Sequence, residues 1–364
     1  MAGGAIGYKS LKTSDPSSPL YVKENDLSLQ TISKYMGSSL QHVVTALPPP
    51  LPHHRNKQIY LLASVILCCV VIHNATLLSL AADNCNIALK DSSGFFTDIP
   101  LSEWKKKKDR VKNQPRHNDK ELGLRSKYTN RNSPSKWYEH NWQTNFECTA
   151  KRRIGGTSEG SKVVCDPHRI PQSARRSGKR SKKESDDGCL IYSFGRGSPN
   201  SPVFDFSFET EILEELGGPD SCELHFFDHR LDNYGGDAPD GIIVHHWGLE
   251  GKVDAPKARR DFMTMKEIVH HLGHEGRSLE IMRIDCDGCE WHTFSEWITS
   301  GVRPRQVVTS LHGAPRNEDE LFEILEKNNY VIFHREADTR YGGMWQEYGF
   351  LKLSPSFFGD NNLD

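Results

Sequence analysis

Three carboxylates lie close together in one short run of this sequence. Asp285, Asp287 and Glu290 fall within six positions, directly after the apolar segment LEIMRI. Like charges held this close raise one another's pKa, or they share a cation or a substrate proton. A helix start explains Glu290 alone, because an acid favours the positive end of the helix dipole. It does not explain Asp285 at the end of an apolar segment, so this run is the first candidate site.

A glycine-containing loop and a further acid follow two other apolar segments. CLIYSF leads into Gly195-Arg-Gly197, where glycine lets the backbone approach a ligand closely. CELHFF leads into Asp228, whose carboxylate can accept both hydroxyls of a ribose, although a solvated loop acid would look the same. Glycine after one strand and an acid after the next is the arrangement that holds a nucleoside cofactor in a Rossmann-like sheet. The dinucleotide fingerprint GxGxxG is absent, because Asn200 stands at its third glycine.

Other residues at the ends of apolar segments complete the candidate set. Ser193 and Phe194 precede the glycine loop, and Trp247 closes IIVHHW. We place these three in the expected cofactor site with the two glycines and Asp228. His312 closes VVTSLH, where a histidine is as consistent with a hydrogen-bonded loop residue as with a catalytic one.

The nine cysteines indicate structural roles more than a metal. Cys286 and Cys289 have the CxxC spacing of a zinc or redox pair, but no second CxxC and no paired His-x3-His accompany them. We therefore expect no metal site. Cys148 and Cys165 bracket a compact segment and are the best candidates for a disulfide in an oxidising compartment. Seven cysteines follow residue 82, so at least one of them stays free or pairs between chains.

The segments that carry these residues alternate between strand and helix patterns. Short apolar runs predict buried strands, and repeats such as Phe208, Ile212 and Leu216 predict amphipathic helices. This order predicts an α/β, Rossmann-like, doubly wound and mostly parallel sheet, with ligands at the carboxyl ends of its strands. The expected strands are 189–194, 222–228, 242–247, 279–285, 306–312, 330–334 and 348–353, and the expected helices are 205–216, 263–272, 291–300 and 318–328.

One segment has the length and composition of a membrane span. Residues 59–82 carry no charge over 24 positions, enough at about 1.5 Å per residue to cross a hydrocarbon core. Basic residues before it and Asp83 after it predict a single-pass type II signal anchor at 58–82, with a cytoplasmic tail at 1–57. A cleaved signal peptide is the alternative. The expected location is the Golgi or endoplasmic reticulum membrane, with the larger part of the chain in the lumen.

Charge is distributed unevenly along the chain. Residues 84–187 hold 24 basic and 13 acidic side chains, a net charge of +11, whereas residues 188–364 hold 16 and 31, a net charge of −15. An acidic C-terminal half argues against nucleic acid as a partner. Composition divides the chain beyond the anchor into a disordered basic stem at 83–140, a lead-in segment with a basic insertion at 141–187, a folded domain at 188–356 and a tail at 357–364.

The run IMRIDCDGCEW resembles the hallmark of FkbM-type methyltransferases and the related methyltransferase-like family. CLIYSFG, FSFETEILEELG and ELHFFDHR resemble the first two strands of that family and its cofactor loop. RRIGGTSEGSKVVCDPHRI resembles the lead-in of eukaryotic members, and the similarity covers roughly residues 148–355. The resemblance implies S-adenosylmethionine as cofactor and a seven-stranded sheet whose last strand is antiparallel. By position, it implies that Gly195 and Gly197 approach the methionine moiety, Asp228 the ribose and Asp285 the methyl donor.

Three positions depart from the pattern of that family. His229 stands where proline is frequent, Asp287 where glutamate is usual, and Ser310 where we expect an acid. Ser310 makes a catalytically silent binding module of the same fold one alternative. A Golgi-type, metal-dependent glycosyltransferase is another, with Asp285-Cys286-Asp287 as its DxD motif on a nucleotide sugar.

The expected reaction is in-line transfer of a sulfonium methyl group to a hydroxyl oxygen, on a glycan or another secretory-pathway substrate. Asp285, Glu290 and His312 are the expected catalytic residues, with Asp285 or His312 as the base. The expected partners are the cofactor, this acceptor and the membrane through residues 59–82.

Overall fold

The described part of the chain begins after the predicted membrane anchor. Every described residue falls in the unit formed by residues 75–364. The predicted tail at 1–57 and anchor at 58–82 lie outside the described residues, as do Gly197 and residues 175–183 of the basic insertion. Among the residues described, no helix is long and apolar enough to span a bilayer. The computed structural model describes residues 87–113, 134–171, 188–195, 204–230, 238–251, 261–313 and 318–359.

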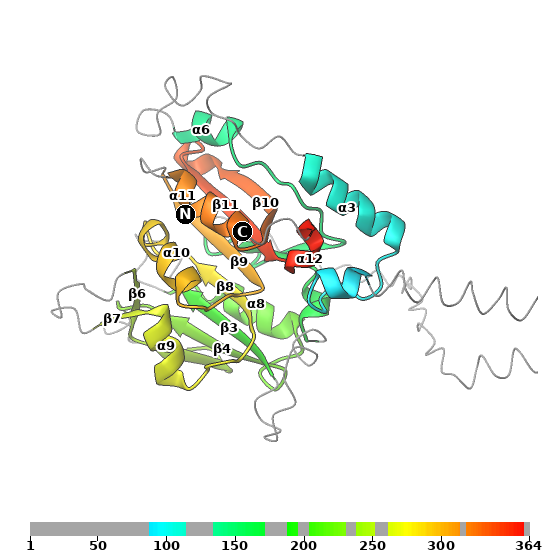
Figure 1. Cartoon of the computed structure of the whole chain (residues 1–364). Coiled ribbons are helices and arrows are strands. Elements are labelled where there is room, and N and C mark those ends of the chain that lie inside the picture. The colour runs from blue at the N-terminus through cyan, green and yellow to red at the C-terminus, as the bar shows by residue number, and fades with distance from the viewer. Residues whose placement is uncertain are drawn as a thin grey trace, which may run out of the picture. The chain divides into compact units, whose positions relative to one another are not determined.

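Seven of the described strands form one sheet. They are β3 (Cys189–Phe194), β4 (Cys222–Phe227), β5 (Ile242–His245), β8 (Leu279–Ile284), β9 (Gln306–His312), β10 (Tyr330–Asp338) and β11 (Trp345–Lys352). Their order across the sheet is β10-β11-β9-β8-β3-β4-β5 (Figure 1). β11 is antiparallel to both of its neighbours, and every other pairing is parallel. The prediction of a doubly wound, mostly parallel sheet is therefore confirmed, together with its antiparallel last strand.

The central strands are buried on both faces because helices cover both sides of the sheet. All residues of β3 and β8 are buried, which is typical of parallel strands. Successive residues of β3, such as Ile191 and Tyr192, belong to two separate apolar cores. The first core contains side chains of α8 (Ser207–Glu215), and the second contains side chains of α9 (Met265–Leu272), α10 (Glu290–Thr299) and α11 (Glu318–Lys327).

The sequence sets the limits of α9 through its caps. Thr264 Oγ1 accepts a hydrogen bond from Glu267 N, and the Glu267 carboxylate accepts one from Thr264 N. This reciprocal pair is a capping box, which satisfies backbone donors at the helix start. Gly273 ends the helix at φ 69°, a left-handed conformation that glycine adopts without strain. The loop to β8 therefore starts at His274.

Some strands differ from their predicted limits. β10 continues past the predicted 330–334, and β11 begins before the predicted 348–353. Most of the added residues are half-buried or exposed, so they do not form an apolar run. β5 ends at His245, so Trp247 lies beyond the strand. A separate parallel pair, β6 (Gly248–Glu250) and β7 (Phe262–Thr264), follows it.

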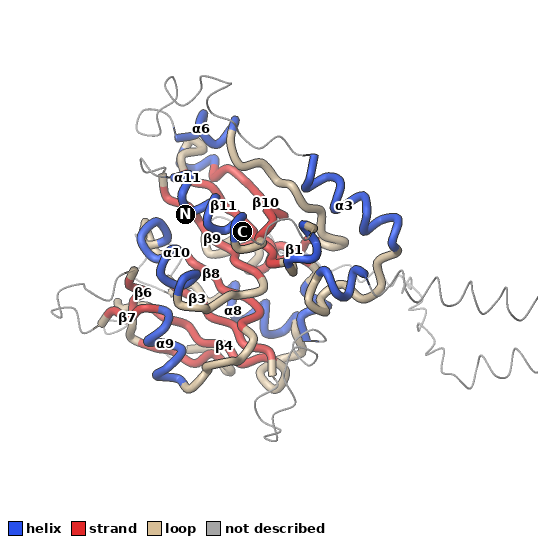
Figure 2. Tube along the Cα trace, viewed as in Figure 1, coloured by secondary structure: helices blue, strands red, loops and turns tan. Residues whose placement is uncertain are grey.

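The predicted disordered stem contains folded structure. Two helices, α3 (Leu101–Asn113) and α6 (Pro134–His140), fall within residues 83–140 (Figure 2). Trp104 of α3 is fully buried, and its indole N–H donates to the Asp91 carboxylate at 3.0 Å. The lysine-rich composition concealed this fold, because α3 exposes most of its lysines while its tryptophan enters the core.

A short hairpin joins the lead-in segment to the sheet. Its strands are β1 (Lys151–Ile154) and β2 (Lys162–Cys165). Cys165 forms a disulfide with Cys148, as predicted. The Gln306 side chain of β9 holds the hairpin: its amide oxygen accepts from Cys165 N at 2.9 Å, and its Nε2 donates to Cys165 O at 2.8 Å. The hairpin is therefore part of the same packed unit as the sheet.

Two further disulfides lie within the described residues. Cys189 pairs with Cys222 across β3 and β4, and Cys286 pairs with Cys289 in the loop after β8. The second pairing agrees with the structural role predicted for the CxxC run, because a disulfide sulfur is not available as a thiolate ligand. Cys85 lies outside the described residues.

Candidate functional site

The ends of β3 and β8 meet at the carboxyl edge of the sheet. Asp285 N donates to Phe194 O at 2.9 Å, and Gly195 follows with φ +90°. A Cβ atom at Gly195 would lie 1.8 Å from the carbonyl oxygen of Asp285. Glycine is therefore required here for two reasons, the positive φ and the approach of the β8 backbone. This contact brings the glycine loop next to the carboxylate run, although Gly195 and Asp285 are 90 residues apart in the sequence.

Asp285 is paired with two buried cations. Its Oδ2 accepts from Lys162 Nζ at 3.1 Å and from Arg283 Nη2 at 3.2 Å. All three side chains are at most 3% exposed. Burial alone would raise the pKa of Asp285, but the Lys162 ammonium and the Arg283 guanidinium outweigh it and hold the pKa below its ordinary value. Of the two alternatives for the carboxylate run, a raised pKa does not hold for Asp285, because two cations contact the group.

Arg283 connects the glycine loop, the hairpin and Asp285. Its Nη1 donates to Gly195 O at 2.9 Å and to Ser193 Oγ at 3.2 Å, and its Nε donates to Gly160 O at 3.2 Å. The side chain is fully buried. A guanidinium offers five donors in a fixed plane, so one residue can hold several backbone segments together.

Ser193 and Phe194 direct their side chains into the protein interior. Ser193 Oγ donates to the buried Glu209 carboxylate, and the Phe194 ring stacks on Phe227 with centroids 4.7 Å apart. Burial raises the pKa of Glu209 despite the opposing Arg283 charge. The side chains of these two predicted cofactor residues therefore support the glycine loop from the protein interior.

His312, the last residue of β9, forms a hydrogen-bonded pair with Glu290, the first residue of α10. Glu290 Oε1 lies 2.8 Å from His312 Nδ1 and also accepts from His312 N at 2.7 Å. His312 Nε2 lies 3.8 Å from Asp285 Oδ1 and 3.9 Å from Asp287 Oδ1. Burial would lower the pKa of His312, but Glu290 and the two aspartates outweigh it and raise the pKa. The three predicted catalytic residues are thus brought together, with Nδ1 held and Nε2 directed at the carboxylates.

Asp287 occupies a strained turn beside this pair. Its φ is +56°, which a residue other than glycine adopts at a cost. The Cys286–Cys289 disulfide closes the turn, and Gly288 N donates to Glu290 Oε2 at 2.9 Å. The turn therefore holds the Asp287 carboxylate over the site in a conformation that the surrounding bonds maintain.

Asp228 lies at the end of β4 and is bound by a neighbour. Its Oδ1 accepts from Arg230 N at 2.8 Å and from Arg230 Nε at 3.0 Å, and its Oδ2 accepts from Arg230 Nη2 at 2.8 Å. The Arg230 Nη1 atom lies 3.4 Å from Asp287 Oδ2. Arg230 thus links the acid after β4 to the acidic turn after β8, and a ligand of Asp228 has to share the carboxylate with it.

Trp247 belongs to an aromatic row next to Asp228. Its ring stacks on His245 with centroids 4.7 Å apart, and His245 stacks on Phe227 at 4.8 Å. Asp228 N donates to His245 O at 3.1 Å, which joins the row to the acid. Burial and nearby histidines lower the pKa of His245 to about 4, so this ring is neutral near pH 7. Trp247 is only half-buried and provides a flat apolar surface for a ligand ring.

An acid stands beside Ser310, although not on the same strand. β9 and β11 pair Ser310 with Glu347, and directly paired residues of antiparallel strands project to the same face. Glu347 Oε2 accepts from Arg153 Nη1 at 3.2 Å, and its Oε1 lies 3.8 Å from Lys162 Nζ. A carboxylate thus occupies this row of the sheet through β11.

The sequence analysis missed the cations and the buried acid under the site. Arg283 carried a usable signal, because a charge inside the apolar run LEIMRI has to be paired when it is buried. Glu209 and Lys162 carried none: an acid in the first turn of a helix and a lysine on a short strand are ordinary surface patterns. Only their long-range partners identify them.

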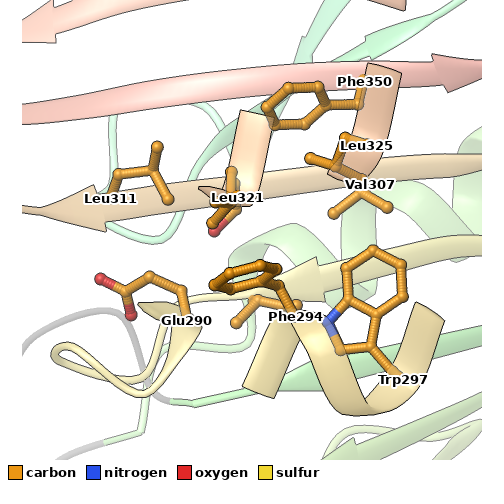
Figure 3. A pocket seen from close by; sticks show the side chains of 10 residues that line it. Glu290, Phe294, Trp297, Val307, Leu311, Leu321, Leu325 and Phe350 are labelled. Atoms are coloured by element: carbon orange, nitrogen blue, oxygen red, sulfur yellow. The ribbon is translucent and has the colours of Figure 1, made fainter. Parts of the chain in front are cut away.

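A small void lies behind the site, between α10, α11 and the sheet (Figure 3). Its volume is about 10 Å³, and its lining is almost entirely apolar, with Phe294, Trp297 and Leu321 among its residues. Glu290 lies at one end with its carboxylate pointing away from the aromatic rings. The void is about the size of one water and is too small for a ligand.

Comparison with known proteins identifies one family. The family model described as "Methyltransferase domain" matches residues 86–352. No curated protein matches the chain.

Several solved structures are similar in part. A Methanococcus jannaschii fibrillarin pre-rRNA processing protein has 10% identity and a TM-score of 0.29, covering 56% of this chain and 83% of its own. An rRNA methylase from Streptococcus thermophilus has 11% identity and a TM-score of 0.27, covering 46% and 89%. A fibrillarin/Nop5p complex has 12% identity and a TM-score of 0.29, covering 51% and 83%.

Proposed function

This chain belongs to the methyltransferase-domain family, and from that membership we propose that it transfers a methyl group from S-adenosylmethionine to a hydroxyl oxygen. The family model covers residues 86–352, most of the described structure. The run IMRIDCDGCEW supports a place among FkbM-type members. When bound, S-adenosylmethionine supplies an electrophilic methyl group on a sulfonium, so alignment with the acceptor is the main requirement on the protein.

The donor set at the carboxyl edge fits this cofactor. Asp228 offers a carboxylate for the ribose hydroxyls, and half-buried Trp247 offers a flat surface for the adenine. Gly195 and Gly197 would leave room for the methionine part, because neither residue carries a side chain. Arg283 supports the loop by holding Gly195 O at 2.9 Å.

The observation that carries the proposal is the orientation of His312. Glu290 fixes its Nδ1 at 2.8 Å, so the neutral imidazole has its lone pair on Nε2, next to Asp285 and Asp287. As the new C–O bond forms and the C–S bond breaks, His312 Nε2 takes the proton of the acceptor hydroxyl. Glu290 then stabilises the imidazolium. Asp285 stays ionised beside His312 Nε2, because Lys162 and Arg283 balance its charge.

A glycan or another secretory-pathway molecule is the acceptor that we propose. The disulfides at Cys148–Cys165 and Cys189–Cys222 support an oxidising compartment. The uncharged segment 59–82 supports a single-pass type II anchor in the Golgi or endoplasmic reticulum, which would expose the domain to lumenal hydroxyl groups.

The glycosyltransferase alternative is disfavoured by the state of Asp285. A DxD motif needs free carboxylate oxygens for a divalent cation, whereas Asp285 Oδ2 accepts from both Lys162 and Arg283. Cys286, between the two aspartates, is closed in a disulfide.

Calorimetric titration of the full chain with S-adenosylhomocysteine tests the proposal. We expect micromolar binding that Asp228→Ala reduces at least tenfold, which is about 1.4 kcal/mol. Asp220→Ala, an exposed acid in the loop before β4, is the matched control and should bind normally. Absence of binding by the folded wild-type chain would refute the cofactor assignment. Binding of a UDP-sugar with Mn²⁺ instead would support the glycosyltransferase, and binding of neither would support a silent module.

A further inference from the structure

Three side chains with metal-binding atoms converge on one point between β4 and the loop after α9. They are Glu223, His225 and His274, and their ligand atoms lie within 4.8 Å of one another. Glu223 Oε1 is 2.7 Å from His225 Nε2 and 3.4 Å from His274 Nε2. From this geometry we propose that the three residues bind a zinc ion, at a site separate from the one for methyl transfer.

The distances suit tetrahedral coordination. Zinc bonds of about 2.0–2.1 Å place neighbouring ligand atoms about 3.3 Å apart. The two separations from Glu223 Oε1, 2.7 Å and 3.4 Å, lie on either side of that value. All three ligand atoms lie within 4.8 Å of one another, close enough to be brought together on one ion.

Both histidines have their second ring nitrogen held by a hydrogen bond. His225 Nδ1 lies 2.7 Å from His245 Nε2, and His274 Nδ1 lies 2.6 Å from the Tyr192 hydroxyl. Metal-binding histidines almost always have such a partner, which sets the tautomer and the ring orientation. In the zinc form each Nδ1 carries the proton and donates it to this partner, while Nε2 presents its lone pair to the ion.

The carboxylate is also oriented, and one of its oxygens stays free of cations. Arg277 Nη1 lies 2.6 Å from Glu223 Oε2, so the guanidinium fixes the group through the oxygen that faces away from the histidines. Glu223 has 34% of its side chain exposed, whereas His225 and His274 are buried. Two histidines and one glutamate leave a fourth position, which this exposed side can fill with water.

Two other groups of metal-binding residues in the described structure are less suitable. Cys286 and Cys289 lie beside Glu290, but their sulfurs form a disulfide. His334, Glu336 and Glu347 form the other group, in which Arg153 contacts both carboxylates. Lys162 lies 3.8 Å from the remaining Glu347 oxygen, so cationic side chains already surround this group.

The position of the site implies a structural role. Glu223 and Asp228 are five residues apart on β4, about 16 Å along the strand, so the ion would not reach the methyl-transfer site. It would cross-link β4 to the loop that starts at His274. Through His245 it would also fix the aromatic row that ends at Trp247.

Zinc titration of the full chain tests the proposal. The protein is treated with a chelator and kept free of thiol reductants, so that its disulfides stay closed. We expect a saturable Zn²⁺ site, and with Co²⁺ a visible absorption band of a four-coordinate ion. His225→Ala and His274→Ala should each abolish both signals. His271→Ala, an exposed histidine on α9, is the matched control and should leave them unchanged.

A milder variant separates metal binding from folding. Tyr192→Phe keeps the buried ring but removes the hydroxyl that holds His274 Nδ1. We expect about a tenfold weaker Zn²⁺ affinity, because loss of an outer-shell partner typically costs 10–100-fold. An unchanged affinity would contradict this ligand set. Failure of the folded wild-type chain to bind Zn²⁺, or full binding by both alanine variants, would overturn the proposal.

Discussion

Lys162 and Asp285 form a buried ion pair between residues 123 positions apart in the sequence. Lys162 Nζ lies 3.1 Å from Asp285 Oδ2, and the two side chains are 1% and 3% exposed. The lysine comes from the lead-in hairpin and the aspartate from the end of a central strand. The segment before the main domain therefore supplies part of the charge balance of the proposed site, which explains why the site is incomplete without it.

Removing the cation of this pair should destabilise the fold. Lys162→Met leaves a buried carboxylate with Arg283 as its remaining close cation, and breaking a buried pair typically costs about 3–5 kcal/mol. Urea unfolding measures the loss. Lys151→Met, an exposed lysine on β1, should change the free energy of unfolding by less than about 0.5 kcal/mol. Equal stability of the two variants would mean that the buried pair contributes nothing.

Gly195→Ala should destabilise the fold more than the same substitution at a glycine with a similar backbone conformation. Its Cβ would lie 1.8 Å from Asp285 O, so the ends of β3 and β8 would have to separate. Gly218 has φ +86° with no atom within 4 Å of an added Cβ, so Gly218→Ala carries only the conformational cost, about 1–2 kcal/mol. We expect the Gly195 variant to lose at least 2 kcal/mol more in denaturant unfolding, about the cost of overpacking. Similar losses for both would show that the two strand ends separate easily.

Methyl transfer should increase with pH through the pKa of His312. The base form is the neutral imidazole, and Glu290, Asp285 and Asp287 raise its pKa above the ordinary value. Glu290→Gln removes a charge and should move the rise in kcat/KM to lower pH. A profile that is the same in both proteins would exclude His312 as the base.

The same shift predicts a change in stability with pH. Because the folded-state pKa is raised, protonated His312 stabilises the fold below its unfolded pKa, and this stabilisation is lost as pH rises through the folded pKa. The difference in unfolding free energy between wild type and His312→Gln, measured by urea unfolding across this range, should therefore shrink as pH increases. A difference that does not vary with pH would contradict the raised pKa.

Arg230→Ala should strengthen cofactor binding. The Arg230 side chain occupies both oxygens of Asp228. Its removal leaves Oδ2 free for a ribose hydroxyl, while Oδ1 keeps only the hydrogen bond from the backbone N–H of residue 230. A partly exposed ion pair is worth up to about 1 kcal/mol, so the Kd for S-adenosylhomocysteine should fall about fivefold. Arg340→Ala removes the same kind of local pairing, with Asp338, and is the matched control. Weaker binding in the Arg230 variant would mean that the arginine itself contacts the cofactor.

Local patterns in the sequence predicted most of the sheet. The predicted strand 306–312 matches β9 at both ends, and 189–194 matches β3. β3 is buried throughout and β9 is buried up to Leu311, so apolar residues recur along most of each run. The prediction stopped early where burial is partial, as in β10, and it overlooked α3, whose one buried tryptophan is outweighed by lysines.

The same distinction applies to the candidate site: local patterns predicted some of its features and missed others. Asp285, His312 and Gly195 could be found because parallel strands bring their carboxyl ends to one edge, so a polar residue that ends an apolar run is placed there by topology. The charge state of Asp285 could not be found, since it depends on Lys162 and Arg283. Contacts over such distances depend on how the hairpin packs, and no local pattern records that.

Local periodicity in the sequence was enough to predict the alternation of strands and helices and the residues at the strand ends, because both follow from the parallel sheet that it implies. Which charged side chains contact one another depends on the packing of the folded chain. This packing pairs Asp285 with Lys162, directs His312 between Glu290 and the aspartates, and gathers Glu223, His225 and His274. Electrostatic interactions depend on the distance between the charges and on their burial, and the fold alone sets both.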